Sequence, residues 1–270
     1  MATFPYARPL FGTGDLNSLH KRLQQIHPDP NLYSDPRNIM TDFPFPFTGD
    51  QLPVDRFDLS DEFCFEYIGR EAFSDLWGTV TKLKVRQSYS RLYIQGTIGY
   101  GKSHILAVLV GLLSRKGKRV VYLPDCRELL RNTMRYMQTA LLCAFADPAS
   151  SGVRDEIRAL KSPEEVISFC EQHRSTYFVI DQMNALDLED ANWDTVNDER
   201  KKTAEKFLDE LTYGQYRITS ASASYKTAVH MGKDQTGDRK LALMGGMSEV
   251  SKCSTHSFVV SFPSSSRNTG

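Results

Sequence analysis

The stretch IQGTIGYGKSH, residues 94–104, places three glycines within six positions, between a short apolar segment and a long apolar run. Glycine loses more conformational entropy on folding than any other residue, so such a cluster is costly to order. A cluster of this kind is favoured where the backbone must approach a ligand with no side chain in between. The pattern therefore indicates a loop whose backbone contacts a bound molecule.

Residues 96–103 match the phosphate-loop pattern G-x-x-x-x-G-K-[ST] at every fixed position. In such a loop, backbone N–H groups surround the phosphates, and the N-terminus of the next helix adds partial positive charge. The alternative is a glycine-rich turn with an exposed lysine, but it requires neither the preceding strand nor the following helix predicted here. The predicted nucleotide-binding residues of this segment are Gly96, Thr97, Ile98, Gly99, Tyr100, Gly101, Lys102, Ser103 and His104.

Two side chains of the loop have separate predicted roles. Lys102 would act in catalysis as a point charge on the β- and γ-phosphates, and we expect it to face solvent when no nucleotide is bound. Ser103 would offer its hydroxyl to Mg²⁺. Mg·ATP is accordingly the predicted ligand.

Strands and helices alternate along the chain from about residue 60. The predicted strands are 91–95, 119–123, 176–181 and 216–222, with only 257–262 strand-like thereafter, and the predicted helices are 71–85, 102–117, 127–146, 163–173 and 194–214. Strands separated by helices imply a mainly parallel sheet that is covered on both faces. The predicted fold class is therefore α/β, a three-layer P-loop NTPase.

Eight of the twelve prolines fall within the first 53 residues. Proline blocks both helices and ladder hydrogen bonds, so this region is predicted to be irregular, with at most one short helix near residues 16–26. Its phenylalanines at 43, 45 and 47 are expected to pack on the following domain rather than bind a partner. The predicted segments are a leader at 1–58, a P-loop NTPase domain at 59–262 and a frayed tail at 263–270.

A phosphate loop of this kind needs a second carboxylate for the metal, at the end of a neighbouring buried strand. The segment YFVID, residues 177–181, supplies it as four apolar residues followed by Asp181. Aspartate is also a favoured N-cap, so the alternative is that Asp181 caps the following helix. Its position after a phosphate loop favours the metal role, through a bound water.

Gln182 occupies the position where many ATPases of this type carry a glutamate that polarises the attacking water. Glutamine cannot accept a proton, but it can orient a water. Gln182 is therefore the third predicted catalytic residue, beside Lys102 and Asp181, and hydrolysis is expected to be slow. Glu189, in the acidic loop that follows, is interpreted as a solvated charge.

Other positions carry alternative interpretations. Ser220, at the tip of the fourth strand, would face the γ-phosphate as a nucleotide sensor, unless it is an ordinary turn serine. Gly69 and Arg70, within YIGRE, are predicted to lie over the base. Residues 199–201, ERK, have the E-x-K spacing of some metal-dependent nucleases, but a charge-paired helix surface is the preferred interpretation.

Composition excludes several classes of protein. Lysine plus arginine equals aspartate plus glutamate, 33 of each, so no overall basic field points to nucleic acid or a membrane as the main partner. The five cysteines are scattered, which suggests reduced thiols in an intracellular compartment, and Cys253 and His256 lack the second half of a zinc site. Neither a signal peptide nor a membrane span is recognisable. A soluble protein of the cytoplasm or nucleus is predicted, and a protein partner and the oligomeric state remain open.

Four segments in order, YIGRE, YIQGTIGYGKSHILAVLVGLL, GKRVVYLPDCREL and YFVIDQMNAL, resemble the nucleotide-binding module of Crinkler-type effector proteins. Retrotransposon-hot-spot proteins share this pattern, within the ATPase group that includes AAA+ and STAND proteins. The resemblance covers about residues 60–222 and implies Mg·ATP binding by residues 96–103, with Asp181 as the metal aspartate and Gln182 beside it. It also implies an effector domain and delivery into host cells. Because no header, helical lid, arginine sensor or effector domain is recognisable, we expect a truncated member or a fragment.

Two functions of different classes fit these observations. The first is an ATPase with slow turnover. The second is a nucleotide-sensing switch or interaction module that binds ATP without productive hydrolysis. A third, a nucleic-acid-acting effector, has no basic patch to support it.

Overall fold

Five parallel strands form the central sheet of the computed structural model, which describes residues 13–84, 90–96, 99–187, 197–221 and 239–243. In chain order, the strands are β3 (Ser90–Gln95), β4 (Val120–Leu123), β5 (Tyr177–Ile180), β6 (Tyr216–Ser220) and β7 (Arg239–Ala242). Their order across the sheet is β4-β5-β6-β3-β7, and every neighbouring pair is parallel. The four strands predicted before residue 222 are thus confirmed.

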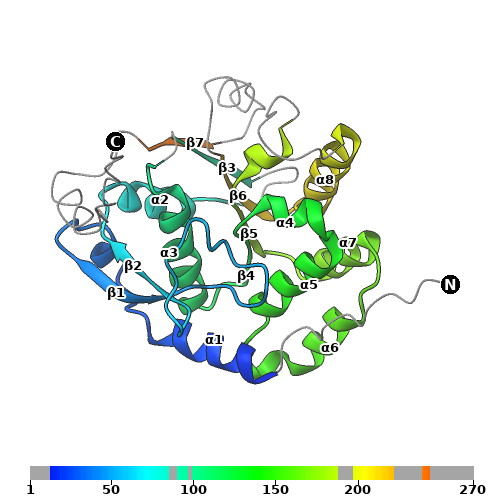
Figure 1. Cartoon of the computed structure of the whole chain (residues 1–270), viewed down its shortest axis with the longest axis horizontal. Helices are drawn as coiled ribbons and strands as arrows, with labels where there is room; N and C mark the ends of the chain where they lie inside the picture. Colours follow the sequence, from blue (N-terminus) through cyan, green and yellow to red (C-terminus); the bar gives the residue numbers. More distant parts are fainter. Residues whose placement is uncertain (1–12, 85–89, 97–98, 188–196, 222–238, 244–270) are drawn as a thin grey trace, which may run out of the picture.

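Helices cover both faces of this sheet. α3 (Lys102–Arg115) leads from β3 to the edge strand β4, whereas α7 (Pro163–Gln172) and α8 (Asp198–Leu211) lie on the return path to β5 and β6. Because parallel crossovers are right-handed, connections that run in opposite directions place their helices on opposite faces. Figure 1 shows α3 on one side of the strands and α7 and α8 on the other. The predicted α/β class, with three layers and a parallel sheet covered on both faces, is confirmed and is consistent with a P-loop NTPase fold.

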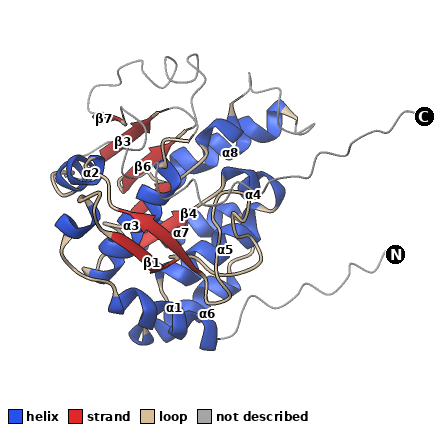
Figure 2. Ribbon diagram, turned by 60° about the vertical axis from the view of Figure 1, so that its left-hand side comes forward, coloured by secondary structure: helices blue, strands red, loops and turns tan. Residues whose placement is uncertain are grey.

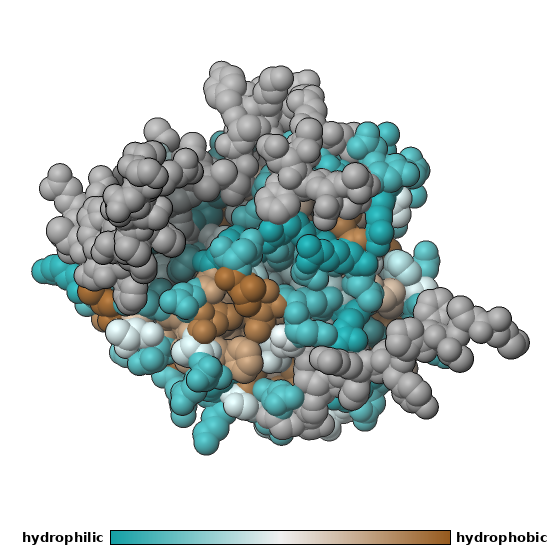
Figure 3. Space-filling view, viewed as in Figure 1, coloured by the Kyte–Doolittle hydropathy of each residue, from teal (hydrophilic) through white to brown (hydrophobic). Residues whose placement is uncertain are grey.

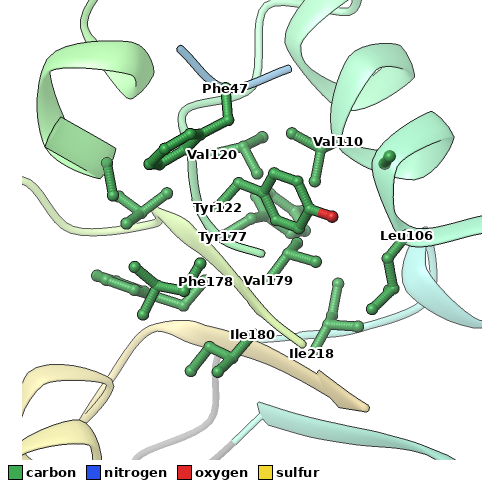
Figure 4. Packing of buried hydrophobic residues seen from close by; sticks show 14 of the residues in the cluster. Phe47, Leu106, Val110, Val120, Tyr122, Tyr177, Phe178, Val179, Ile180 and Ile218 are labelled. Carbon is green, nitrogen blue, oxygen red and sulfur yellow. The ribbon is translucent and has the colours of Figure 1, made fainter. Parts of the chain in front are cut away.

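The strands are buried because both faces are covered. All residues of β4 and β5 are buried, and ten of the fourteen residues of α3 are buried as well. Leu106 and Val110 of α3 pack near Tyr122, Val179 and Ile218 (Figure 4). The nearly continuous apolar sequence of α3 is therefore explained by its position against the sheet.

The leader is more regular than its prolines suggest, and the expectation of at most one short helix is wrong. α1 (Thr13–Gln25) is the predicted helix, but a 3₁₀ helix η1 (Pro30–Tyr33) and a strand β1 (Ile39–Pro44) follow it. β1 pairs antiparallel with β2 (Cys64–Ile68), across the predicted boundary at residue 58. Proline is tolerated there because Pro44 is the last residue of the strand.

The leader phenylalanines pack on the domain, as predicted. Phe43, Phe45 and Phe47 are all buried and belong to the main hydrophobic core. The ring of Phe45 lies 6.1 Å from that of Tyr122 on β4, measured between centroids. The leader and the sheet therefore share one core, and Figure 2 shows β1 close to α3.

The predicted helix 127–146 is interrupted. It divides at Asn132 into α4 (Cys126–Arg131) and α5 (Thr133–Ala144), because Asn132 has extended backbone angles, φ −152° and ψ 83°. Its side chain accepts a hydrogen bond from the N–H of Arg135, so it caps α5. An asparagine within a helical pattern thus starts a new helix.

Other elements agree with the sequence or extend it. α2 (Ala72–Val80), α7 and α8 lie within predicted ranges, and Ser162 caps α7 by accepting from the N–H of Glu165. The Glu165 carboxylate accepts from the N–H of Lys161, one residue before the N-cap. The structure adds elements that were not predicted: η2 (Pro148–Ser150), α6 (Ser151–Ala159), η3 (Met183–Leu186) and β7. Residues 257–262 and the predicted tail lie outside the described residues.

The described surface is mostly hydrophilic, and apolar side chains gather near the centre of the face in Figure 3. Among the described residues, the large hydrophobic side chains that are exposed are Ile39, Val54, Phe63 and Tyr213. Ile39 and Val54 belong to the leader. No described helix combines the length and apolar content needed to cross a bilayer.

Candidate nucleotide-binding site

Most of the predicted site residues lie at the carboxyl ends of β3, β5 and β6. The phosphate loop follows β3, Asp181 follows β5, and Ser220 ends β6, which lies between the other two strands. The strand register pairs Ile94 with Ser220 and Ile180 with Thr219, so these ends are level. Open α/β sheets bind ligands at this edge, where the chain changes direction across the sheet. The topology therefore brings together residues that are far apart in the sequence.

The phosphate loop has backbone angles that require glycine. Gly101, which precedes α3, has φ 69° and ψ 26°, and Gly99 has φ 86°. These left-handed conformations are strained for residues with a side chain. A Cβ atom on Gly101 would also lie 2.0 Å from Nη1 of Arg70. Thr97 and Ile98 of the predicted loop lie outside the described residues.

Lys102 is not solvent-facing, so that expectation is wrong. Its side chain is 5% exposed, and its Nζ donates a hydrogen bond of 2.6 Å to the carbonyl oxygen of Gly96. Burial lowers the pKa of Lys102, and the nearby Asp181 carboxylate opposes that shift. A buried ammonium needs an acceptor, and the first carbonyl of the loop supplies it.

The N-terminus of α3 presents N–H groups at the loop. The N–H of Ile105 bonds back to the carbonyl of Gly101 and starts the helical hydrogen-bond ladder, so the N–H groups of the first turn before it point out of the helix end toward the loop. Backbone N–H groups at a helix N-terminus can bind an anion. The side chain of Ser103 is partly exposed at the same place.

The ring of His104 packs against aromatic side chains and is not placed to contact phosphate. It stacks on Phe57 of the leader, with centroids 4.5 Å apart, and meets the ring of Phe65 edge-on at 5.5 Å. Burial, followed by the charges of Arg70 and Arg56, lowers the pKa of His104 to about 4. The backbone N–H is therefore the group of His104 that is available to phosphate.

Asp181 is fully buried at the tip of β5. Its Oδ1 accepts hydrogen bonds from the Ser220 hydroxyl at 2.6 Å and from the N–H of Gln182 at 2.9 Å. Its Oδ2 accepts from Nη1 of Arg56 at 3.2 Å. The following helix η3 has Gln182 as its N-cap, without a side-chain cap bond, so Asp181 does not cap it.

Ser220 and Gln182 both restrain Asp181. Ser220, the predicted nucleotide sensor, is 1% exposed. Its hydroxyl donates a hydrogen bond to the Asp181 carboxylate. Gln182 has φ 61° and ψ 40°, a left-handed conformation that costs about 1–3 kcal/mol for a residue other than glycine. Such strain persists where surrounding contacts impose it, and it is common at functional sites.

Arg70 reaches the phosphate loop from the segment before α2. Its Nη1 donates a 2.8 Å hydrogen bond to the carbonyl oxygen of Tyr100, and burial lowers its pKa. Gly69 packs so closely on the leader that a Cβ atom would lie 2.0 Å from the carbonyl oxygen of Asp35. This pair therefore connects the leader to the loop, and its position over a base stays a prediction.

Sequence reasoning missed Arg56, which enters the site from the leader. Its Nη2 lies 3.1 Å from Oδ2 of Asp125 and donates to the carbonyl oxygen of Pro124 at 2.8 Å, while Nη1 bonds Asp181. Pro124 and Asp125 follow β4, so Arg56 connects the tips of two neighbouring strands. Arg127 completes what we call the strand-tip ion cluster, which consists of Asp55, Arg56, Asp125, Arg127 and Asp181. In the sequence, Arg56 is simply a charged residue next to the apolar Phe57, in a segment predicted to be irregular. No local pattern therefore marked it as a site residue.

The residues fit a magnesium ion that arrives with a nucleotide. Within the described ranges, no group of three or more histidine, cysteine, aspartate or glutamate side chains could hold a metal alone. Mg²⁺ is usually bound by one or two protein oxygens together with substrate phosphates and waters. The Ser103 hydroxyl and the Asp181 carboxylate are oxygen donors of this kind.

The nuclease-like E-x-K spacing lies at the start of α8 rather than at a strand end. The N–H of Glu199 is capped by Asn197, and Lys201 is turned inward, where its Nζ donates to the carbonyl oxygen of Asp187 at 2.8 Å. The helix is less uniformly solvated than predicted, because Lys201, Ala204 and Phe207 are buried. Glu189, Cys253 and His256 lie outside the described residues.

No protein-family model and no curated protein matches the sequence. One solved structure that matches is described as the crystal structure of a DNA replication initiation factor. The match has 14% sequence identity and a TM-score of 0.36, and it covers 63% of this chain and 44% of that chain. The chain therefore spans less than half of the length of that protein.

Proposed function

We propose that this chain binds Mg·ATP or a related nucleoside triphosphate through residues 96–103 and hydrolyses it slowly. The observation that carries the proposal is the arrangement at one edge of the sheet. A phosphate loop follows β3, and the Asp181 carboxylate follows β5, held by Ser220 from the strand between them. This arrangement supports a site for phosphate on one side and for a metal on the other.

Each residue has a stated role in this proposal. The N–H groups at the start of α3 donate to phosphate oxygens, and Lys102 leaves the Gly96 carbonyl to bind them. Mg²⁺, when bound, neutralises negative charge on the phosphates. Ser103 and Asp181 hold it, Asp181 through a bound water. Gln182 orients the attacking water, and turnover is slow because an amide cannot accept the proton.

A nucleotide-sensing switch is the second candidate, and the position of Arg56 favours it. Oδ1 of Asp181 accepts from Ser220 and Gln182, and Oδ2 accepts from Arg56. Both oxygens of the carboxylate are therefore already hydrogen-bonded within the protein. In a switch, nucleotide binding alone would change these contacts. The resemblance to Crinkler-type modules supports action inside cells as part of an effector, after delivery to a host.

Nucleotide binding and phosphate release, measured on the same preparation, test the proposal. Lys102→Ala should weaken nucleotide affinity by at least about tenfold, because charge-assisted hydrogen bonds are lost. The matched control is Lys118→Ala, an exposed lysine beyond the other end of α3. Equal affinity in wild type and Lys102→Ala would refute the site. Binding without phosphate release in the wild type would select the switch.

A further inference from the structure

Arg56 is held at the metal side of the candidate site by a fixed turn of the leader. The N–H groups of Arg56 and Phe57 both bond the carbonyl oxygen of Pro53, at 3.0 and 3.2 Å. Phe57 is buried and stacks on His104, one residue beyond the phosphate loop. The backbone on both sides of Arg56 is therefore anchored, and its guanidinium is directed at Asp181.

The strand-tip ion cluster, taken together with Lys102, carries no net charge. The carboxylates of Asp55, Asp125 and Asp181 bring three negative charges, and Arg56, Arg127 and Lys102 bring three positive charges, so the sum is zero. A buried carboxylate without a partner would be costly, and Asp181 is fully buried. The guanidinium thus neutralises Asp181 when no metal is present.

We propose that Arg56 takes the place of the metal in the nucleotide-free protein and must release Asp181 when Mg·nucleotide binds. This inference rests on the proposed function of the site. It makes the leader turn at residues 53–57 a nucleotide-responsive element.

The oxygen contacts of Asp181 give the reason for this competition. Oδ1 already accepts from Ser220 and from the N–H of Gln182, and Arg56 takes Oδ2. A water on the metal would therefore have to use the oxygen that Arg56 holds. Two cations on one carboxylate oxygen repel each other strongly where water is excluded. Arg56 and a hydrated Mg²⁺ are thus alternatives.

The other residues of the strand-tip ion cluster lower the free-energy cost of separating Arg56 from Asp181. Asp125 retains Arg127, whose Nη2 lies 2.5 Å from its Oδ2, so this buried carboxylate stays paired when Arg56 leaves. Nε of Arg56 is buried without a hydrogen-bond partner, and its distance to Asp55 is 3.6 Å, so Arg56 is not fully satisfied where it is. Val54, in the same turn, is 74% exposed. The turn that carries Arg56 therefore lies at the surface of the protein.

Binding of a fluorescent ATP analogue, with Mg²⁺ and with EDTA, provides the first test. Arg56→Ala should bind the analogue about tenfold more tightly than wild type with Mg²⁺, because no charge-assisted hydrogen bond has to be broken. In EDTA, the two proteins should bind alike. The matched control is Arg37→Ala, which removes an exposed leader arginine that pairs with Asp35.

Amide hydrogen exchange of the wild-type protein provides the second test, and it requires no variant. The N–H groups of Arg56 and Phe57 are hydrogen-bonded to Pro53, so they should be protected without nucleotide and exchange faster when Mg·nucleotide is added. If Arg56→Ala does not fold, this measurement and the milder variant Arg56→Lys decide the question.

Two outcomes would overturn the proposal. Weaker Mg·nucleotide binding by Arg56→Ala would mean that Arg56 is a ligand of the nucleotide rather than a competitor of the metal. Unchanged affinity together with unchanged exchange at residues 53–57 would mean that Arg56 only connects β4 to β5. Lys102→Ala tests the proposed nucleotide site independently of Arg56. If this variant loses binding, the nucleotide site is supported even when the Arg56 experiments show no competition with the metal.

Discussion

Lowering the pH from 7 to 5 should destabilise this protein by about 2 kcal/mol through His104 alone. In the folded protein, burial between Phe57 and Phe65 and the charges of Arg70 and Arg56 lower the pKa of His104 from 6.5 to about 4. In the unfolded chain the ring regains its ordinary pKa, so between these two values the unfolded state binds one more proton. Stability is therefore complete above about pH 6.5 and falls as the pH decreases towards 4.

The magnitude follows from the width of this pH range. Each pH unit in which the unfolded state holds one additional proton changes the free energy of unfolding by about 1.4 kcal/mol, so the 1.5 units between pH 6.5 and 5 give about 2 kcal/mol. The carboxylates whose pKa is lowered in the fold, Asp35, Asp55, Asp147 and Glu164, change stability in the same direction. They titrate below this range and therefore contribute little above pH 5.

Urea unfolding at 25 °C, in steps from pH 7 to 5, measures this loss. His104→Phe keeps an aromatic ring between Phe57 and Phe65 and has no proton to bind, so its free energy of unfolding should be nearly constant over this range. Parallel pH profiles for wild type and His104→Phe would refute the reasoning. A directly measured pKa of His104 near 6.5 in the folded protein would refute it as well.

Three further predictions concern the site and the scaffold. Asp181→Asn should bind nucleotide equally well with Mg²⁺ and with EDTA, measured by fluorescence titration; a retained preference for Mg²⁺ would contradict the metal role of Asp181. Gln182→Glu should raise the rate of phosphate release by about 10²-fold, as expected for a general base, whereas brisk wild-type hydrolysis that Gln182→Ala leaves unchanged would assign the water to another residue. Asn132→Ala should lower the free energy of unfolding by about 1 kcal/mol through loss of the α5 cap, with Asn132→Asp as the control that retains a capping oxygen; equal stability of all three proteins would show that the cap is unimportant.

The sequence predicted the elements whose patterns are local and strong. The phosphate loop was recognisable because its glycines and Lys102 stand at fixed spacing between a strand and a helix, and the buried strands were visible as short apolar runs. Asp181 was predictable for the same reason, because it ends one of these runs. The structure places the phosphate loop and Asp181 at the same edge of the sheet, beyond the carboxyl ends of β3 and β5.

Other features depended on contacts between distant segments. β1 was missed because the many prolines of the leader argue against a strand, and only the partner strand β2 makes the pairing favourable. β7 has the sequence RKLA, which carries no apolar run, and it forms because β3 offers a parallel neighbour. The inward position of Lys102 and the approach of Arg56 to Asp181 are tertiary contacts, which no local pattern encodes.

Among the described strands, the two outer ones differ in how they resist association with other molecules. β4 is buried along its whole length, because α5 packs on it and the leader ring of Phe45 lies beside Tyr122. β7 is short, and it carries Arg239 and Lys240, both exposed. Covering an edge strand, or keeping it short and charged, prevents a second chain from adding its own strand there. Removal of the leader up to and including Phe45 should therefore expose β4 and make the protein prone to aggregate through that edge.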